Sequence, residues 1–366
     1  MNRKSQPPST FYRDMLRLAS PIVFQNLITT AVGSADVIML GWVSQTALSA
    51  GSLASQIMFI LNLVYTGISS GIGMLAAQYW GKKDTKTIEE IMGIGMKLSI
   101  PVSFLFFLLA CFSPRHLMLI FTAEGELVEA GIPYLRIVGI SYLFMGISQV
   151  YLCTMRSIER VIFATLANAS ALTLNILLNG VLILGLFGFP RMGIIGVALA
   201  TAIARGVELL ICMADACWFP AIRFRPRLLF HHNPILFGDF MKYSLPAFGN
   251  EVCWGLAFST YSVIMGHLGS DMVAANAVVV VARNLGTVVC FGIANAGAII
   301  LGKSIGEGHM EKVKADASRF CRITFFSGIA GGILIFFLRP VFMNMAELSP
   351  VSRGYLKGML YINMYY

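Results

Sequence analysis

The sequence has few charged residues: Asp, Glu, Lys and Arg make up 12% of its 366 residues. Soluble domains carry about 25%, so the surface of this chain cannot be covered mainly by hydrated groups. Hydrophobic residues reach 57% and the mean hydropathy is +0.75. Apolar runs of about 20 residues, long enough to cross a bilayer as a helix, recur along the chain. We therefore predict an all-α membrane protein.

Several chemical signatures are also lacking. The seven cysteines show no C-x-x-C spacing and lie mostly in apolar runs, where Cys behaves as a small apolar side chain. The start, MNRKSQPPST, lacks the apolar segment of a cleaved signal peptide. We find no H-E-x-x-H, no intramembrane Asp pair and no Ser–His pair. The sequence thus favours neither an enzyme nor a cofactor-binding protein.

The apolar runs predict nine complete membrane spans and part of a tenth. Lys and Arg gather in alternate loops, as in Lys82, Lys83 and Lys86 after the second span, while the intervening loops carry at most one. This alternation predicts a cytoplasmic N-terminus and a multi-pass protein of a plasma membrane, which we expect to be bacterial. It also accounts for the net charge of +9 without nucleic-acid binding. The predicted spans are 16–40, 53–78, 94–113, 132–154, 162–187, 194–217, 243–266, 275–301, 319–338 and 354 onward.

The chain repeats itself after 225 residues, as the matches Pro21 with Pro246 and Gly41 with Gly266 show. Six spans precede the second copy, so both copies have the same orientation, as in transporters with two parallel lobes. We predict a helical bundle of two parallel-repeat six-helix lobes. The predicted parts are an N-terminal lobe at 1–217, a cytoplasmic loop at 218–242, and a C-terminal lobe at 243–366. The last is expected to be truncated in this chain, with about four helices.

The stretch GAIILGKS at 297–304 fits the phosphate-loop pattern G-x-x-x-x-G-K-[ST]. That pattern binds phosphate only where a glycine-rich turn links a strand to a helix. The repeat instead matches this stretch with 72–79, at the end of the second span. A membrane helix uses its N–H groups for its own hydrogen bonds, so we predict no nucleotide binding.

An acidic residue lies inside the first predicted span. Gln25, Thr29 and Asp36 are spaced by four and seven residues, which places them on one helical face. Ionisable groups within the bilayer are costly and mark functional sites. Asp36 therefore becomes the first candidate for binding a coupling ion.

Amides line the fifth span in the same way. Asn168, Asn175 and Asn179 share one face, and Thr201 follows in the sixth span. With a carboxylate, such amide and hydroxyl oxygens suit Na⁺ or form a protonatable site. The alternative is hydrogen bonding between helices, which explains Asn168 and Thr201 equally well.

Glu251, in the seventh span, has no cation near it in the sequence. Its repeat partner is Asn26, whereas Asp36 corresponds to Tyr261, so the two lobes differ in their polar groups. We regard Glu251 as a substrate or proton site, with a satisfied structural carboxylate as the alternative, and group Gln25, Asn26, Thr29 and Tyr261 with it. Structural roles are expected for four further charged residues: Arg136, Arg205, Glu208 and Arg283.

The segments LASPIVFQNLITTAVGSADVIMLGWVS, GMLAAQYWGKKD, PYLRIVG and NILLNGVLILG resemble the multidrug and toxic compound extrusion family. The resemblance implies twelve spans in two lobes and cation-coupled drug efflux by alternating access. It assigns Asp36, Asn175, Asn179 and Thr201 to a first-lobe cation site, and Glu251 to the family's seventh-span glutamate. Asn179 stands where many members carry a second carboxylate, which leaves Na⁺ and H⁺ both open.

The sequence thus predicts a secondary antiporter that exchanges Na⁺ or H⁺ for amphipathic, often cationic, compounds. It is expected to work as a monomer in the lipid bilayer, with no cofactor besides the coupling ion. A lipid-linked oligosaccharide flippase of related architecture is the alternative. Such a flippase would need a more cationic cavity, and the central candidates here are acidic. A membrane-embedded enzyme and an ion channel are the remaining classes.

Overall fold

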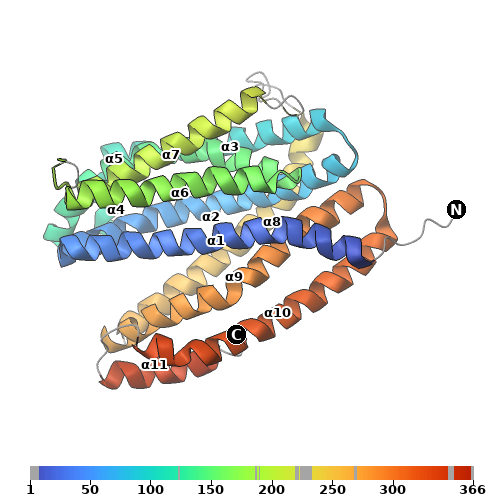
Figure 1. The fold of residues 1–366 in the computed structure, drawn as a ribbon. Helices are drawn as coiled ribbons and strands as arrows, with labels where there is room; N and C mark the ends of the chain where they lie inside the picture. The colour runs from blue at the N-terminus through green and yellow to red at the C-terminus, as the bar shows by residue number, and fades with distance from the viewer. Residues whose placement is uncertain are drawn as a thin grey trace. The chain divides into compact units, whose positions relative to one another are not determined.

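The computed structural model describes residues 8–122, 124–185, 188, 190–218, 222, 233–267, 270–344 and 350–363. Within these ranges the elements are all α-helices, which confirms the predicted fold class (Figure 1). The helices are α1 (Pro8–Val43), α2 (Gln45–Gly81), α3 (Thr85–Phe112), α4 (Pro114–Phe121), α5 (Gly125–Ser157), α6 (Val161–Leu184), α7 (Gly193–Trp218), α8 (Pro234–His267), α9 (Ser270–Gly306), α10 (Met310–Asn344) and α11 (Pro350–Asn363).

Each predicted span coincides with one of these helices. Among the described residues, seven helices are long and apolar enough to cross a membrane: α2, α3, α5, α6, α7, α9 and α10. The protein is therefore a multi-pass membrane protein. The short helix α4 was not predicted, because eight residues are too few for a membrane-length hydropathy signal. It begins at Pro114, a residue whose fixed φ favours the first turn of a helix.

Several helices extend beyond their apolar runs. α1 begins at Pro8, eight residues before the predicted span, and α8 begins at Pro234, inside the predicted loop 218–242. Hydropathy reports where a helix is apolar, whereas the backbone stays helical into the polar interface. Capping side chains then set several helix starts. At α2, the Ser44 hydroxyl accepts a hydrogen bond from the backbone N–H of Ala47 at 3.0 Å.

The predicted repeat is visible in the helix limits. α2 and α9 begin 225 residues apart and also end 225 residues apart. The same spacing separates the first residues of α3 and α10, and those of α5 and α11. The second part of the chain therefore reproduces the turn positions of the first, although few residues are identical.

The helices form two compact units. One comprises 28–251, and the other combines 1–27 with 252–366. The boundaries fall inside α1 and α8, at nearly equivalent positions of the repeat, so each of these helices contributes to both units. The division of the chain into lobes at 1–217 and 243–366 stays a prediction.

The unit of residues 28–251 is built around α5, which packs against α2, α3 and α7. Small residues allow the close approach: a Cβ at Gly146 would collide with the side chain of Ser103 on α3. Buried hydroxyls link the same helices. Ser99 donates to the carbonyl oxygen of Gly146 at 2.7 Å, and the Tyr65 and Ser103 hydroxyls are 2.8 Å apart. This framework holds α5 against α7, where the candidate site lies.

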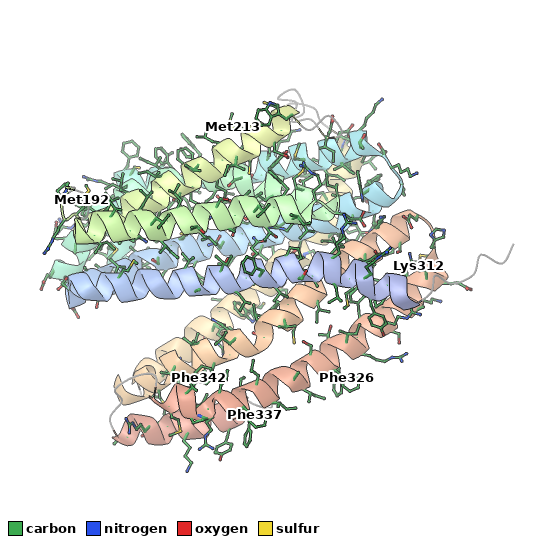
Figure 2. The ribbon with its side chains drawn as sticks, viewed as in Figure 1. Met192, Met213, Lys312, Phe326, Phe337 and Phe342 are labelled. Carbon is green, nitrogen blue, oxygen red and sulfur yellow. The ribbon has the colours of Figure 1, made fainter. Side chains whose placement is uncertain are left out.

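The unit of residues 252–366 contains α9, α10 and α11, together with the first part of α1. Phe11 on α1 packs edge-on against Phe320 on α10, with ring centroids 5.1 Å apart. Most of α10 is exposed, including Phe326 at 65% and Phe337 at 70% (Figure 2). Such a continuous apolar exposure fits contact with lipid.

The phosphate-loop lookalike at 297–304 lies wholly within α9. The helix continues through it to Gly306, and Gly297 packs against the ring of Phe320. The backbone N–H groups are therefore committed to the helix, and the prediction that this stretch is a helix end is confirmed.

Candidate cation-coupling site

The α6–α7 hairpin positions three of the four predicted cation-coupling residues. α6 ends at Gly185, whose φ of 69° lies in the left-handed region that glycine adopts at little cost. The backbone N–H of Met192 then donates to the carbonyl oxygen of Leu182 at 3.0 Å, just before α7 begins. The two helices consequently run antiparallel with a fixed register.

Asn175, Asn179 and Thr201 meet at the contact between α6 and α7; we call them the coupling layer. Asn175 Nδ2 donates to Thr201 Oγ1 at 3.2 Å, and Asn179 Nδ2 donates to Asn175 Oδ1 at 3.3 Å. Asn175 is 5% exposed and Asn179 is fully buried. The i, i+4 spacing on α6 thus produces the shared polar face that the sequence predicts.

The chemistry of the coupling layer is that of hard oxygen ligands with no charge of their own. Amide and hydroxyl oxygens are ligands that alkali and alkaline-earth cations prefer. Bringing a cation into this buried layer would require a carboxylate to balance its charge. Hydrogen bonding between helices explains the same contacts, so the ion-binding role stays a prediction.

Asp36 is the predicted source of that carboxylate. Its backbone belongs to α1, but its side chain lies outside the described residues. On the same helix, Gln25 and Asn26 are half-buried and Thr29 is exposed, and all three side chains are engaged in interactions. Their grouping as one polar face stays a prediction.

The predicted substrate or proton site involves α8. Glu251 is half-buried there, and among the described residues of its own unit it has no hydrogen-bonding or ion-pair partner. A partly buried carboxylate without a fixed partner is available for a cation or a proton. Tyr261, its companion in the prediction, is 38% exposed.

The charged residues that were given structural roles do form local interactions. Arg205 Nη1 and Glu208 Oε2 are 2.6 Å apart on α7, in an ion pair in which Glu208 is fully buried. The Arg283 guanidinium stacks over the ring of Phe258, 4.7 Å from its centroid. These contacts agree with the sequence interpretation.

One polar cluster escaped the sequence analysis. Arg160 binds both carboxylate oxygens of Asp215, at 2.6 and 2.8 Å, and the Tyr151 hydroxyl donates to the same carboxylate at 2.7 Å. We call these three residues the Asp215 cluster. The hydrogen bond with Asp215 raises the pKa of Arg160 above its usual value. The available signal was a lone acid at the end of α7 and an arginine in the preceding basic loop.

The chain was then compared with known proteins. The family model MatE matches residues 21–181 and 246–364, and the two matches begin 225 residues apart, in agreement with the repeat. A probable multidrug resistance protein NorM of Rhizobium meliloti is 29% identical over 84% of this chain and 66% of its own length. One from Thermotoga maritima is 22% identical, over 93% of this chain and 74% of its own.

Solved structures show the same fold. A MATE transporter in complex with MaL6 has a TM-score of 0.86 at 20% identity, covering 96% of this chain and 78% of the other. A MOP superfamily transporter from Pyrococcus furiosus, described as having a binding pocket of reversed polarity, has a TM-score of 0.84 at 21% identity. It covers 98% of this chain and 81% of its own.

The chain spans about two thirds of the length of several curated relatives, between 64% and 66% for the first three. The relatives and structures above are described as transporters or multidrug resistance proteins, and none as an enzyme. The family model covers both copies of the repeat and most of the described helices. The chain therefore belongs to the MatE family of membrane transporters.

Proposed function

We propose that the protein exports amphipathic, cationic compounds in exchange for Na⁺ or H⁺. The observation that carries this proposal is the family match over both repeat copies, combined with a buried oxygen layer at Asn175, Asn179 and Thr201. Two lobes of the same orientation suit a transporter that exposes one site alternately to each side of the membrane.

Asp36 supplies the charge for the coupling ion in this proposal. Asn175, Asn179 and Thr201 supply neutral oxygens that orient it. A coupling ion drives efflux only if it and the cargo prefer different conformations of the protein. Release of the ion or proton would then accompany cargo binding.

Glu251 is the proposed contact for the cationic cargo or a second proton. Gln25, Asn26, Thr29 and Tyr261 would add polar contacts around it. A negative site selects lipophilic cations over the pyrophosphate group of a lipid-linked oligosaccharide, which favours drug efflux over the flippase alternative.

The test uses the full-length protein purified and reconstituted into liposomes. Movement of ethidium, a lipophilic cation, is followed by fluorescence while a Na⁺ or a H⁺ gradient is imposed without ATP. Gradient-driven movement that saturates with dye supports the antiporter. Strict dependence on ATP, or movement of lipid-linked oligosaccharide without dye, would overturn it.

A further inference from the structure

Polar residues recur along one face of α7. They are spaced by four and three residues, which keeps them on a single stripe of the helix. Thr201 belongs to the coupling layer and Asp215 to the Asp215 cluster, while Glu208 lies seven residues from each. Seven residues correspond to about 10 Å along a helix, so Glu208 lies midway between the two groups. The stripe consists of Thr201, Arg205, Glu208, Cys212 and Asp215.

The antiparallel helix α6 places a polar residue opposite Glu208. Asn175 contacts Thr201, and Arg160 contacts Asp215, which fixes the register at two points. Seven residues back along α6 from Asn175 is Asn168, and seven residues forward along α7 from Thr201 is Glu208. Asn168, 7% exposed, therefore lies level with the fully buried Glu208.

Two hydroxyls lie at the same level. Thr165 precedes Asn168 by three residues on α6 and is 5% exposed. On α5, Phe144 contacts Gly206 and Tyr151 contacts Asp215, so the face between them is turned toward α7. Ser148 is on that face and is fully buried. The register thus gathers four polar side chains in the layer of Glu208.

One oxygen of each of these side chains has no hydrogen-bonding partner among the described protein atoms: Glu208 Oε1, Asn168 Oδ1, Thr165 Oγ1 and Ser148 Oγ. Leaving buried oxygens unpaired is costly, and such groups are normally satisfied by protein or by ordered water. The carboxylate and amide oxygens accept, and the two hydroxyls can donate. One water molecule matches this set, donating two hydrogen bonds and accepting two.

The charges in the layer favour water over a metal cation. Arg205, 2.6 Å from the other oxygen of Glu208, already neutralises its carboxylate. A bound Na⁺ would add an uncompensated charge in the buried core of the unit. In addition, the described residues contain no group of three or more His, Cys, Asp or Glu side chains placed to hold a metal ion.

We propose that Glu208, Asn168, Thr165 and Ser148 enclose a buried water site that passes protons between the coupling layer and the Asp215 cluster. A proton carried by the water forms an O–H bond at Glu208 Oε1, and that bond breaks again when the water takes the proton onward. No other bond changes. This inference rests on the proton-coupled form of the proposed function.

The surrounding charges explain why Glu208 would relay a proton and not store it. Arg205 faces it on α7 and opposes its lasting neutralisation, and Cys212 follows one turn later. Beyond them lie the carboxylate of Asp215 on α7, the Tyr151 hydroxyl from α5, and the Arg160 guanidinium at the start of α6.

The first experiment measures hydration of the layer in full-length protein by X-ray hydroxyl-radical labelling and mass spectrometry. Cys212, 2% exposed and one turn from Glu208, should be oxidised faster than Cys153, which is 7% exposed in the same unit. In the double variant Ser148→Ala/Thr165→Val, which keeps the side-chain shapes but removes both hydroxyls, this labelling should fall about threefold. Cys212 labelling no faster than that of Cys153 would overturn the water site.

The second experiment measures dye transport by the same variant in liposomes. Proton-driven transport should fall about tenfold, while any Na⁺-driven transport is kept. The matched control, Ser170→Ala/Thr173→Val, makes the same two changes on the exposed face of α6 and should match the wild type. Unchanged proton-driven transport in the layer variant, or a wild type driven by Na⁺ alone, would overturn the relay. The latter result would still support the antiporter, whereas a wild type that no gradient drives would contradict the proposed function.

Discussion

Arg160 Nη1 and Nη2 hold the two carboxylate oxygens of Asp215 at 2.6 and 2.8 Å. This paired contact joins the start of α6 to the end of α7, and the Tyr151 hydroxyl adds α5 to the same carboxylate. Paired guanidinium–carboxylate hydrogen bonds are among the strongest polar contacts in proteins. The Asp215 cluster therefore locks one end of the α5–α6–α7 bundle, and the coupling layer is held within that bundle.

Asp215→Asn should destabilise the protein by about 2 kcal/mol, because a partly buried guanidinium loses its counter-charge. Tyr151→Phe removes a single hydrogen bond and should cost about 1 kcal/mol. Thermal unfolding of the purified protein, compared with the exposed-site control Asp14→Asn, measures both effects. Equal melting temperatures for Asp215→Asn and the control would contradict this role.

Asp84 caps α3 and should give a pH-dependent contribution to stability. The Thr87 hydroxyl donates to its carboxylate at 2.6 Å and the Thr87 N–H at 3.2 Å, and these hydrogen bonds lower the pKa of Asp84 below its usual 3.8. A lowered folded-state pKa adds stability above pH 3.8, and that stability is lost as the pH falls through the folded-state value.

Asp84→Ala should therefore cost about 1 kcal/mol at pH 7, as for other lost helix caps. Asp84→Asn keeps a capping oxygen and should cost less. Chemical unfolding at pH 7 and pH 3 measures both variants. A penalty for Asp84→Ala that is as large at pH 3 as at pH 7 would show that the carboxylate charge contributes nothing.

The sequence predicted the helices because each span is a separate apolar run, and the repeat because turns need Gly and Pro at fixed positions. It also predicted that Asn175 and Asn179 share a face, since that follows from helical spacing within one segment. Short α4 was missed because eight residues carry too little hydropathy signal.

Contacts between helices were harder to predict. The pairing of Arg160 with Asp215 and the level of Asn168 against Glu208 depend on the register of α6 against α7, which a single sequence does not fix. The Gly185 turn and the hydrogen bond from Met192 to Leu182 set that register in the structure. Seven-residue steps from Thr201 to Glu208 and Asp215 were visible in the sequence, but their partners were not.

Lys303→Arg should leave gradient-driven dye transport within about twofold of the wild type, because its phosphate-loop pattern lies on α9 and binds no nucleotide. The change keeps the positive charge at the end of the helix. Transport by the purified variant, normalised to the amount reconstituted, provides the measurement. Complete loss with normal insertion would revive a nucleotide-binding role for 297–304.

Asp36→Asn should abolish gradient-driven transport while the protein still inserts into the membrane. The amide keeps the shape of the side chain but removes the charge that balances a coupling ion. Asp14→Asn, an exposed carboxylate on the same helix, is the matched control. Normal transport by Asp36→Asn with unchanged ion dependence would place the coupling site elsewhere, with Glu251 as the next candidate.

Asn179→Asp should change how the coupling layer handles its ion. The new carboxylate would lie beside Asn175, whose Oδ1 is 3.3 Å from the present Asn179 amide nitrogen. If Asp36 reaches the same layer, two carboxylates there repel each other, so one keeps its proton to a higher pH. We expect an upward shift in the pH optimum of transport, or Na⁺ binding tighter by about tenfold, equivalent to about 1.4 kcal/mol.

Transport is measured against pH and Na⁺ concentration for Asn179→Asp and for Asn295→Asp, an exposed asparagine on α9 that serves as the control. The double variant Asp36→Asn/Asn179→Asp separates charge count from position. If a single carboxylate in the layer is sufficient, the double variant should recover part of the transport lost in Asp36→Asn. Identical pH and Na⁺ dependence in Asn179→Asp and the wild type would mean that the ion does not contact position 179.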